Sequence, residues 1–295
     1  MKTIGTYKNG NYCVYMFDDG TKVRVTSEDS FIPDKPESID IKITDYCDIG
    51  CPMCHENSSI NGKHADLSNI AFLKTLRPYS ELAIGGGNPL SHPHLLGFLE
   101  KCKERGIIAN MTVNQKHFIE NFQLLLELQS RGLVHGIGVS VTSVDSKGVL
   151  SLLSALSNAV VHVINGVIPI DELRKLYDHD LRLLILGYKD FRRGAYAHTA
   201  KTDRRMEEMH KELPVVFEKF KVVSFDNLAL KQLKVRDFVS KDEWENYYMG
   251  DDGQFTMYID LVNREFAKSS TSTIRWSLTD DIHDMFAQVR NSSGW

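Results

Sequence analysis

The most constraining feature of this sequence is a short loop that carries three cysteines in a C-x3-C-x2-C spacing. The cysteines are Cys47, Cys51 and Cys54, and the loop directly follows an apolar, strand-like run at residues 39–46. Cubane iron–sulfur clusters take one cysteine per iron. Three thiolates held this close can ligate three irons of a [4Fe-4S] cluster and leave the fourth iron without a protein ligand. The pattern therefore predicts one cluster with an open iron.

Two alternatives remain for the three cysteines. A structural zinc site normally takes four protein ligands, and three thiols can also be unrelated buried side chains. The chain has five cysteines, and the other two, Cys13 and Cys102, stand alone. They form no disulfide framework, and we expect both to be packing residues. A second cysteine-ligated cluster would need three or four more thiolates, so we expect only one.

A second motif follows the next apolar run, at residues 82–84, and consists of Gly85, Gly86, Gly87, Asn88 and Pro89. Together with the cysteine spacing, it resembles the radical S-adenosylmethionine (radical SAM) enzymes, whose GGEP motif has Glu where this chain has Asn. The resemblance implies that SAM chelates the open iron. It also implies that an electron from the cluster cleaves SAM to methionine and a 5′-deoxyadenosyl radical, which abstracts hydrogen from a substrate.

The resemblance further implies SAM contacts at the carboxyl ends of neighbouring strands. The glycines give the methionine end of SAM access to the backbone, and Met53, in place of the family's usual aromatic residue, can lie near the adenine. Four later residues are expected cofactor contacts: Asn114, Ser140, Asn165 and Tyr188. The alternative for each is a side chain that only bonds loop backbone. Near Ser140 the family often has an arginine, where this chain has only Lys147.

From residue 38 the sequence alternates strand-like and helix-like segments, which favours a parallel sheet covered by helices. Six strands are expected, at residues 39–46, 82–84, 107–113, 136–141, 160–164 and 181–186. Six strand–helix units are too few for an eight-stranded barrel. The family resemblance covers residues 38–220 and implies an α/β fold, a partial (β/α)6 TIM-like barrel with functional residues at the carboxyl ends of its strands.

The remaining segments flank this barrel. Turn signals at Asn9-Gly10 and Asp19-Gly20 predict a small N-terminal β-meander, followed by a linker that ends at residue 37. We expect residues 221–295 to form an α+β extension that covers the barrel mouth. The chain is thus expected to divide into residues 1–37, 38–220 and 221–295. Helices are expected around residues 67–76, 93–105, 118–131, 147–156 and 171–177. A further charged helix after residue 201 is expected to end at Pro214, and a further strand is expected at residues 222–230.

Composition limits the environments that suit this protein. Apolar residues make up 42% of the 295 residues and charged residues 25%, which is typical of a globular protein with a sizeable core. No apolar run reaches about 18 residues, and the N-terminus lacks the apolar core of a signal peptide. We therefore expect a cytoplasmic, oxygen-sensitive protein that does not bind membranes. The net charge of −4 gives no general attraction to nucleic acid.

A local excess of positive charge follows the sixth expected strand. Arg192 and Arg193 lie where substrates would enter a barrel, and paired arginines suit phosphate or carboxylate groups, so we expect them to bind substrate. The leading substrate is a peptide modified in a maturation pathway, and a nucleotide or nucleoside is the alternative. An electron donor such as flavodoxin or ferredoxin is the expected partner. A non-enzymatic Fe–S or zinc protein that senses redox state or binds a partner is a third hypothesis, against which the glycine motif argues.

Overall fold

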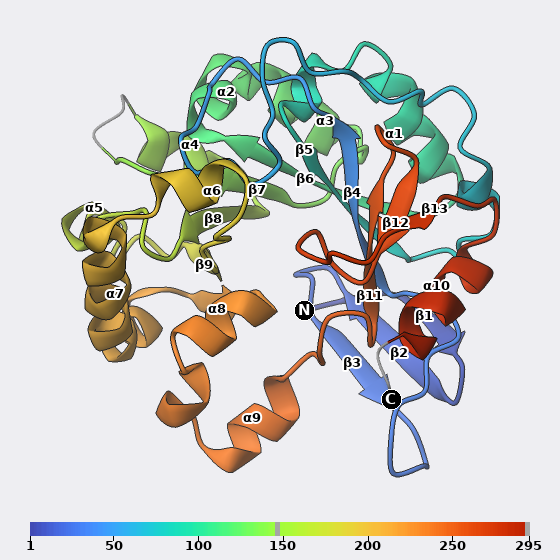
Figure 1. Ribbon diagram of the computed structural model, residues 1–295. Coiled ribbons are helices and arrows are strands. Elements are labelled where there is room, and N and C mark those ends of the chain that lie inside the picture. The colour runs from blue at the N-terminus through green and yellow to red at the C-terminus, as the bar shows by residue number, and fades with distance from the viewer. Residues whose placement is uncertain (145–147, 293–295) are drawn as a thin grey trace.

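The computed structural model describes residues 1–144 and 148–292 (Figure 1). Its first element is an antiparallel sheet in the order β1-β2-β3, formed by β1 (Thr3–Asn9), β2 (Tyr12–Phe17) and β3 (Lys22–Val25). Both turn signals are confirmed, because Gly10 and Gly20 have φ angles of 59° and 91°. Glycine adopts such angles without the clash that a Cβ atom would cause. The expected N-terminal meander is therefore present.

Within the described residues, the main sheet has ten strands in the order β10-β9-β8-β7-β6-β5-β4-β11-β12-β13. Six of them run parallel and neighbour one another in sequence order: β4 (Ser38–Thr44), β5 (Glu81–Gly86), β6 (Ile108–Asn114), β7 (Ile137–Ser140), β8 (Ala159–Ile164) and β9 (Arg182–Leu186). These are the six expected strands. The fold class is thus confirmed as α/β with a mostly parallel sheet.

The sheet continues beyond both edges of these six strands. At one edge β10 (Val222–Phe225) pairs in parallel with β9. At the other edge β11 (Thr256–Asp260) pairs in parallel with β4. Two antiparallel strands, β12 (Glu265–Ala267) and β13 (Trp276–Ser277), follow β11 outward. Strands from both sides of residue 220 therefore share one sheet, and the expected division at that residue stays a prediction.

The strand-like run at residues 222–230 forms a strand only in its first half. β10 ends at Phe225, and the Asp226 side chain then accepts a hydrogen bond from the Ala229 backbone N–H at 2.7 Å. An aspartate at this position favours the start of a helix. Helix α8 (Asn227–Gln232) accordingly follows, and the expectation of a strand as far as residue 230 is wrong.

Helices cover the sheet between successive strands (Figure 1). The described helices are α1 (Leu95–Glu104), α2 (Gln115–Glu120), α3 (Phe122–Ser130), α4 (Val149–Ala155), α5 (Ile170–Arg174), α6 (Arg193–Ala197), α7 (Ala200–Lys219), α8, α9 (Lys241–Tyr247), which stands away from the sheet, and α10 (Ile282–Asn291), with 3-10 turns at η1 (Ala71–Lys74), η2 (Pro89–Ser91) and η3 (Val235–Phe238). The helix expected at 67–76 is thus reduced to η1, and the one expected at 118–131 is divided into α2 and α3. Lys147, in the helix expected at 147–156, lies outside the described residues. None of the described helices is both long and apolar enough to cross a membrane.

Helix α7 continues past Pro214, which corrects the expected helix end at this residue. A proline inside a helix removes one backbone hydrogen bond and costs about 3 kcal/mol. Leu213 and Val216 are fully buried on the same helix, and burying each of these side chains contributes about 1.5–3 kcal/mol. Packing of the apolar face therefore outweighs the lost bond, while Pro214 itself is exposed.

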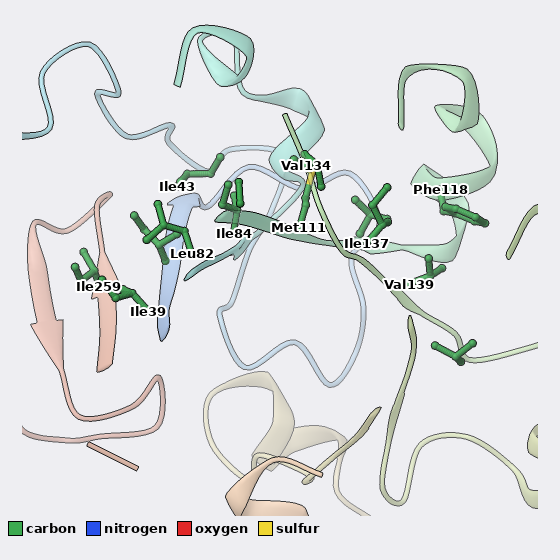
Figure 2. Close-up of a cluster of buried hydrophobic side chains, with 14 of the residues drawn as sticks. Ile39, Ile43, Leu82, Ile84, Met111, Phe118, Val134, Ile137, Val139 and Ile259 are labelled. Carbon is green, nitrogen blue, oxygen red and sulfur yellow. The ribbon is translucent and has the colours of Figure 1, made fainter. Parts of the chain in front are cut away.

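The hydrophobic core lies between the sheet and its helices, and Figure 2 shows its centre. Along β4, Ile39, Ile41 and Ile43 are all buried in this core. Successive side chains of a strand point to opposite faces. Asp40 and Lys42 therefore point to the other face, which is the inside of the partial barrel.

The meander covers the amino ends of the main strands. Its inner face buries Tyr12, Val14 and Met16 against Phe255, and Ile108 packs on the same cluster. Phe255 immediately precedes β11 and Ile108 begins β6, so both contacts lie where main strands start. The cysteine loop instead follows the carboxyl end of β4. The meander and the cysteine loop thus lie at opposite ends of the strands.

One side chain on the inner face is a histidine that has no polar partner among the described residues. His162 on β8 lies over Gly138 of β7, where a Cβ atom would stand 2.2 Å from the imidazole ring. Burial lowers the pKa of His162 to about 4. Its Nδ1 atom is buried and has no hydrogen-bond partner among the described residues. The imidazole is therefore neutral at neutral pH.

We predict that replacing His162 by phenylalanine makes stability less sensitive to acid. An unfolded histidine takes up a proton near pH 6.5, whereas folded His162 does so only near pH 4. The stability of the parent therefore falls as pH decreases through this window. Lowering the pH from 7 to 4.5 should reduce the free energy of unfolding of the parent by about 2 kcal/mol more than that of the variant, as measured by urea denaturation.

A difference between the two proteins that does not change with pH would contradict this prediction. Asp40 also titrates in the window, because desolvation inside the partial barrel raises its pKa to about 6, and it stabilises the folded protein as pH falls. It is present in the parent and in the variant, so its contribution cancels in the comparison.

Candidate active site

The cysteine loop is closed at its base by backbone pairing. Isolated bridges join Thr44 to His64 and Tyr46 to Ser59. The Cys47 N–H donates to the Ser59 carbonyl at 2.9 Å, and the Ser59 N–H donates to the Asp45 carbonyl at 3.0 Å. The segment between Cys47 and Ser59, which contains all three cysteines, is thus held at the carboxyl end of β4.

The thiols on this loop fit a cluster better as a group than as separate side chains. Burial raises the pKa of Cys47 and Cys51, and the charges of neighbouring cysteines act in the same direction. Three adjacent thiolates therefore need a positive counter-charge, which iron supplies. No three His, Cys, Asp or Glu side chains in the described part of the chain converge on a site for one metal ion. A cubane cluster does not require this, because each cysteine binds a different iron.

The two remaining cysteines lie away from the loop. Cys102 is fully buried in the core, as expected for a packing residue. Cys13 lies on β2 but is exposed, which corrects the expectation that it packs inside. Side chains of a strand alternate between faces, and the inner face of β2 is already occupied by Val14 and its neighbours.

A histidine that sequence reasoning missed fixes the loop from the other side. The Asp48 carboxylate lies 2.7 Å from Nε2 of His117, a buried residue on α2. This hydrogen bond lowers the pKa of Asp48. It ties the cysteine loop to the helix after β6. A single histidine without a spacing pattern gives no signal for such a contact in the sequence.

The glycine motif packs directly against the residues that lead into the cysteine loop. The Gly87 N–H donates to the Thr44 carbonyl at 2.7 Å, and the Asn88 N–H donates to the Tyr46 carbonyl at 2.6 Å. Gly86 has a φ of 114°, and a Cβ atom there would stand 2.3 Å from the Thr44 carbonyl oxygen. At Gly87 a Cβ atom would stand 2.1 Å from the Tyr46 carbonyl oxygen. The close approach of the two segments thus explains why Gly86 and Gly87 are glycines.

Gly85 differs from the two glycines that follow it. A Cβ atom at this position would meet no atom within 4 Å. Gly85 pairs with Lys42 of β4, whose side chain points into the barrel. Open space therefore adjoins Gly85 on the inner face, next to the cysteine loop.

The other expected cofactor residues lie at strand ends, and they differ in whether their side chains already form hydrogen bonds. Asn88 and Asn114 each accept a hydrogen bond from a backbone N–H two residues later, at 3.2 Å and 2.9 Å. The Ser140 hydroxyl forms no hydrogen bond with the described residues. The Asn165 side chain is buried and donates to Gln232, but its Oδ1 atom has no partner in the described part of the chain.

Two further expected residues lie close to each other. The Tyr188 hydroxyl is buried and donates to the Gly194 carbonyl at 2.7 Å. Met53 is half-buried, and its carbonyl oxygen would stand 3.6 Å from a Cβ atom on Gly194. The residues after β9 thus contact the cysteine loop. The cofactor roles of Met53, Tyr188 and the strand-end residues stay predictions.

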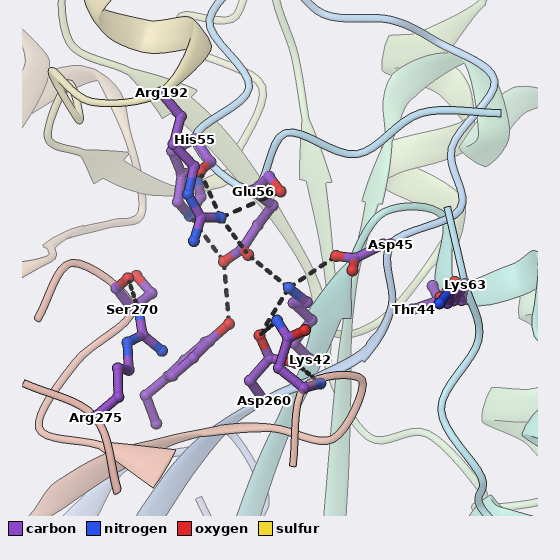
Figure 3. A network of polar contacts seen from close by, with 12 residues as sticks. Lys42, Thr44, Asp45, His55, Glu56, Lys63, Arg192, Asp260, Ser270 and Arg275 are labelled. Atoms are coloured by element: carbon purple, nitrogen blue, oxygen red, sulfur yellow. Dashed lines mark hydrogen bonds and ion pairs between the residues drawn. The ribbon is translucent and has the colours of Figure 1, made fainter. Parts of the chain in front are cut away.

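A buried ion cluster joins the cysteine loop to the C-terminal segment (Figure 3). The Lys42 ammonium lies 2.7 Å from Asp45, 2.8 Å from Asp260 and 3.3 Å from Glu56. The Tyr258 hydroxyl donates to Glu56 at 3.2 Å. Burial alone would raise the pKa of Glu56, but the bond to His55 and nearby lysine charges lower it to about 2. Glu56 is therefore ionised at neutral pH.

The basic residues after β9 bind the cysteine loop in this structure. Lys189 donates to Ser270 at 2.9 Å and lies 3.2 Å from Nε2 of His55. Arg192 donates to the His55 and Glu56 carbonyls, both at 3.3 Å (Figure 3). Arg193 donates to the carbonyl of Ser58, the residue before Ser59, at 2.9 Å. Substrate binding by Arg192 and Arg193 stays a prediction.

We predict opposite tolerances at two neighbouring glycines. Gly86→Ala places a Cβ atom against the Thr44 carbonyl at a positive φ, and this should destabilise the protein by about 1–3 kcal/mol. Gly85→Ala meets open space and should not reduce stability. Thermal unfolding of the metal-free proteins measures both effects, and equal melting temperatures would contradict the packing role of Gly86.

Comparisons with known proteins support the fold. No family model matches the chain. A segment of 81 residues, 26% of this chain, is 26% identical to the PqqA peptide cyclase of Methylorubrum populi and covers 21% of that protein. Streptococcus suis SuiB bound to the precursor peptide SuiA is similar over 86% of this chain, with a TM-score of 0.58 and 16% identity. The chain covers 65% of SuiB, so it spans less than two thirds of both relatives.

A second group of structures agrees. A histidine-tagged form of anSMEcpe with bound AdoMet is similar over 86% of this chain and 79% of its own, with a TM-score of 0.55 and 11% identity. At such identities the likeness is one of fold. The motifs and the topology point to the same group of proteins. The chain therefore has the partial barrel of the radical SAM enzymes, as its cysteine and glycine motifs predicted.

Proposed function

We propose that this protein is a radical SAM enzyme that binds one [4Fe-4S] cluster through Cys47, Cys51 and Cys54 and binds SAM at the open iron. One observation carries the proposal: the residues that lead from β4 into the cysteine loop are hydrogen-bonded directly to the glycine motif after β5, on the carboxyl ends of a partial barrel. When bound, the cluster supplies the electron that cleaves SAM to methionine and a 5′-deoxyadenosyl radical, which abstracts hydrogen from the substrate.

The residues of this chain then have distinct tasks. Thr44 and Tyr46 fix the loop against the glycine motif, and Asp48 fixes it to α2. Gly85 leaves room for the methionine end of SAM. The Ser140 hydroxyl, which has no hydrogen-bond partner among the described residues, suits a polar group of SAM, and the Oδ1 of Asn165, which also lacks a partner there, can accept from the adenine or ribose.

A peptide is the substrate that the comparisons favour. SuiB was solved with a precursor peptide, anSMEcpe with the Cp18Cys peptide, and the Methylorubrum relative is named for the PqqA peptide. We therefore propose peptide modification in a maturation pathway. An electron donor such as flavodoxin or ferredoxin would reduce the cluster, and a reducing, cytoplasmic environment would preserve it.

The first experiment tests the cluster and the cleavage of SAM. Protein reconstituted without oxygen should hold about four irons and four sulfides per chain, and reduction with dithionite should yield 5′-deoxyadenosine from SAM. The triple variant Cys47→Ala, Cys51→Ala, Cys54→Ala should lose the iron. Cys13→Ala and Cys102→Ala should keep it, because these side chains lie away from the loop.

A variant at Gly85 separates the two cofactors. Gly85→Leu fills the open space beside the loop, so it should keep the iron but bind SAM at least tenfold more weakly, while Gly85→Ala binds it with little change. SAM binding as tight in Gly85→Leu as in the parent would contradict the placement of SAM. Stoichiometric zinc in place of iron would contradict the proposed radical SAM activity and would favour a zinc-binding protein.

The second experiment tests substrate binding by the arginine pair. If Arg192 and Arg193 hold an anionic group of the peptide, replacing both by glutamine should raise KM several-fold and weaken its dependence on salt. Arg204, which is exposed and faces Glu208 on α7, provides the matched control Arg204→Gln. Unaltered peptide kinetics, or loss of iron in the double variant, would contradict the substrate role.

A further inference from the structure

We infer that Arg193 is a positioning residue for the cluster: its guanidinium holds the cysteine loop and makes the reduction potential of the group bound there less negative. The inference rests on the proposed function. It assigns to Arg193 a task that does not involve the substrate. Three kinds of observation support it, from the contacts of Arg193, from the backbone around it and from its unpaired charge.

The contacts of Arg193 place it against the base of the cysteine loop. It is the first residue of α6 and donates from Nη2 to the Ser58 carbonyl at 2.9 Å. Ser58 is buried, and the next residue, Ser59, accepts the N–H of Cys47. The bond from Arg193 thus lies one residue from the pairing that closes the loop.

The backbone around Arg193 is fixed in this place. Tyr188 donates its buried hydroxyl to the Gly194 carbonyl at 2.7 Å. A Cβ atom on Gly194 would stand 2.1 Å from the Lys189 carbonyl oxygen, so only glycine permits this turn. Arg192 has a φ of 52°, which residues other than glycine seldom adopt. The chain accepts an uncommon conformation here and so brings Arg193 onto the loop.

The charge of Arg193 has no acidic partner in the part of the chain that the structure describes. It forms no ion pair with a carboxylate among the described residues, and its Nε atom is buried without a hydrogen-bond partner there. A buried N–H without an acceptor is unfavourable. The next residue, Gly194, lies beside Met53, whose carbonyl oxygen would stand 3.6 Å from a Cβ atom on Gly194, and Met53 directly precedes Cys54. The segment that carries the Arg193 cation therefore lies next to the cysteines.

Arg192 shows the contrast. Its guanidinium lies 3.7 Å from the Glu56 carboxylate and its side chain is 43% exposed. Its charge is thus screened by a partner and by water. Of the two adjacent arginines, only Arg193 brings an unpaired positive charge to the loop.

This charge has a definite effect on electron transfer. Reduction adds one negative charge to the cluster, and a cation in a site shielded from water stabilises the reduced form. The net charge around a cluster and the hydrogen bonds to its sulfurs are known determinants of its potential. Removing the charge of Arg193 should therefore make the cluster harder to reduce.

The experiment measures the midpoint potential of the reconstituted cluster by an EPR-monitored redox titration, without SAM or peptide. Arg193→Gln should shift the midpoint to a more negative value than in the parent. Arg193→Lys, which keeps the charge, should stay near the parent. Arg205→Gln is the matched control, because Arg205 also donates to a backbone carbonyl, that of Val167, but lies on α7. Its midpoint should not change.

The outcomes separate this inference from the proposed function. An unchanged midpoint in Arg193→Gln with full iron content overturns the inference alone. If Arg193→Gln takes up no iron, Arg193→Lys decides: a midpoint equal to that of the parent supports the role of the charge, and a negative shift contradicts it. A parent protein that takes up no iron overturns the proposed function and this inference with it.

Discussion

The buried ammonium group of Lys42 joins three parts of the chain that are far apart in sequence. It lies on β4 and contacts carboxylates of the cysteine loop, through Glu56, and of β11, through Asp260. A lysine this deep is tolerated only when opposite charges and hydrogen bonds replace its water. The two carboxylates in turn need the lysine between them. The conformation of the cysteine loop therefore depends on a strand that is made much later.

The strands could be predicted because their signals are local. Apolar runs and turn residues located the six parallel strands, and the glycines at the turns located the meander. The pairing of β11 with β4 could not be predicted, because no local pattern says which distant strand completes a sheet edge. The helix end expected at Pro214 was wrong for a related reason. The packing of Leu213 and Val216, which sequence alone does not reveal, outweighs the local preference of proline to end the helix.

The candidate site divides in the same way. The spacing of the three cysteines and the run of glycines are local patterns, and the structure places the two motifs side by side. The packing role of Gly86 could not be predicted, because the clash there involves a carbonyl from another strand. The contact of Asp48 with His117 joins residues that no motif connects. The positive charge at Arg193 could be read from the sequence, but its hydrogen bond to the Ser58 carbonyl could not.

The place of β11 at the edge of β4 also bears on synthesis. Until residues 256–260 have been made, β4 has a neighbour on one side only, and its other side exposes unpaired backbone groups. Such open edges invite aggregation, and charged side chains on the edge discourage it. Asp40 and Lys42 provide these charges on the nascent strand. Lys42 gains its contact with Asp260, and Glu56 of the cysteine loop its hydrogen bond from Tyr258, only when β11 has been made, so the cysteine loop reaches its final set of contacts after translation of the C-terminal segment.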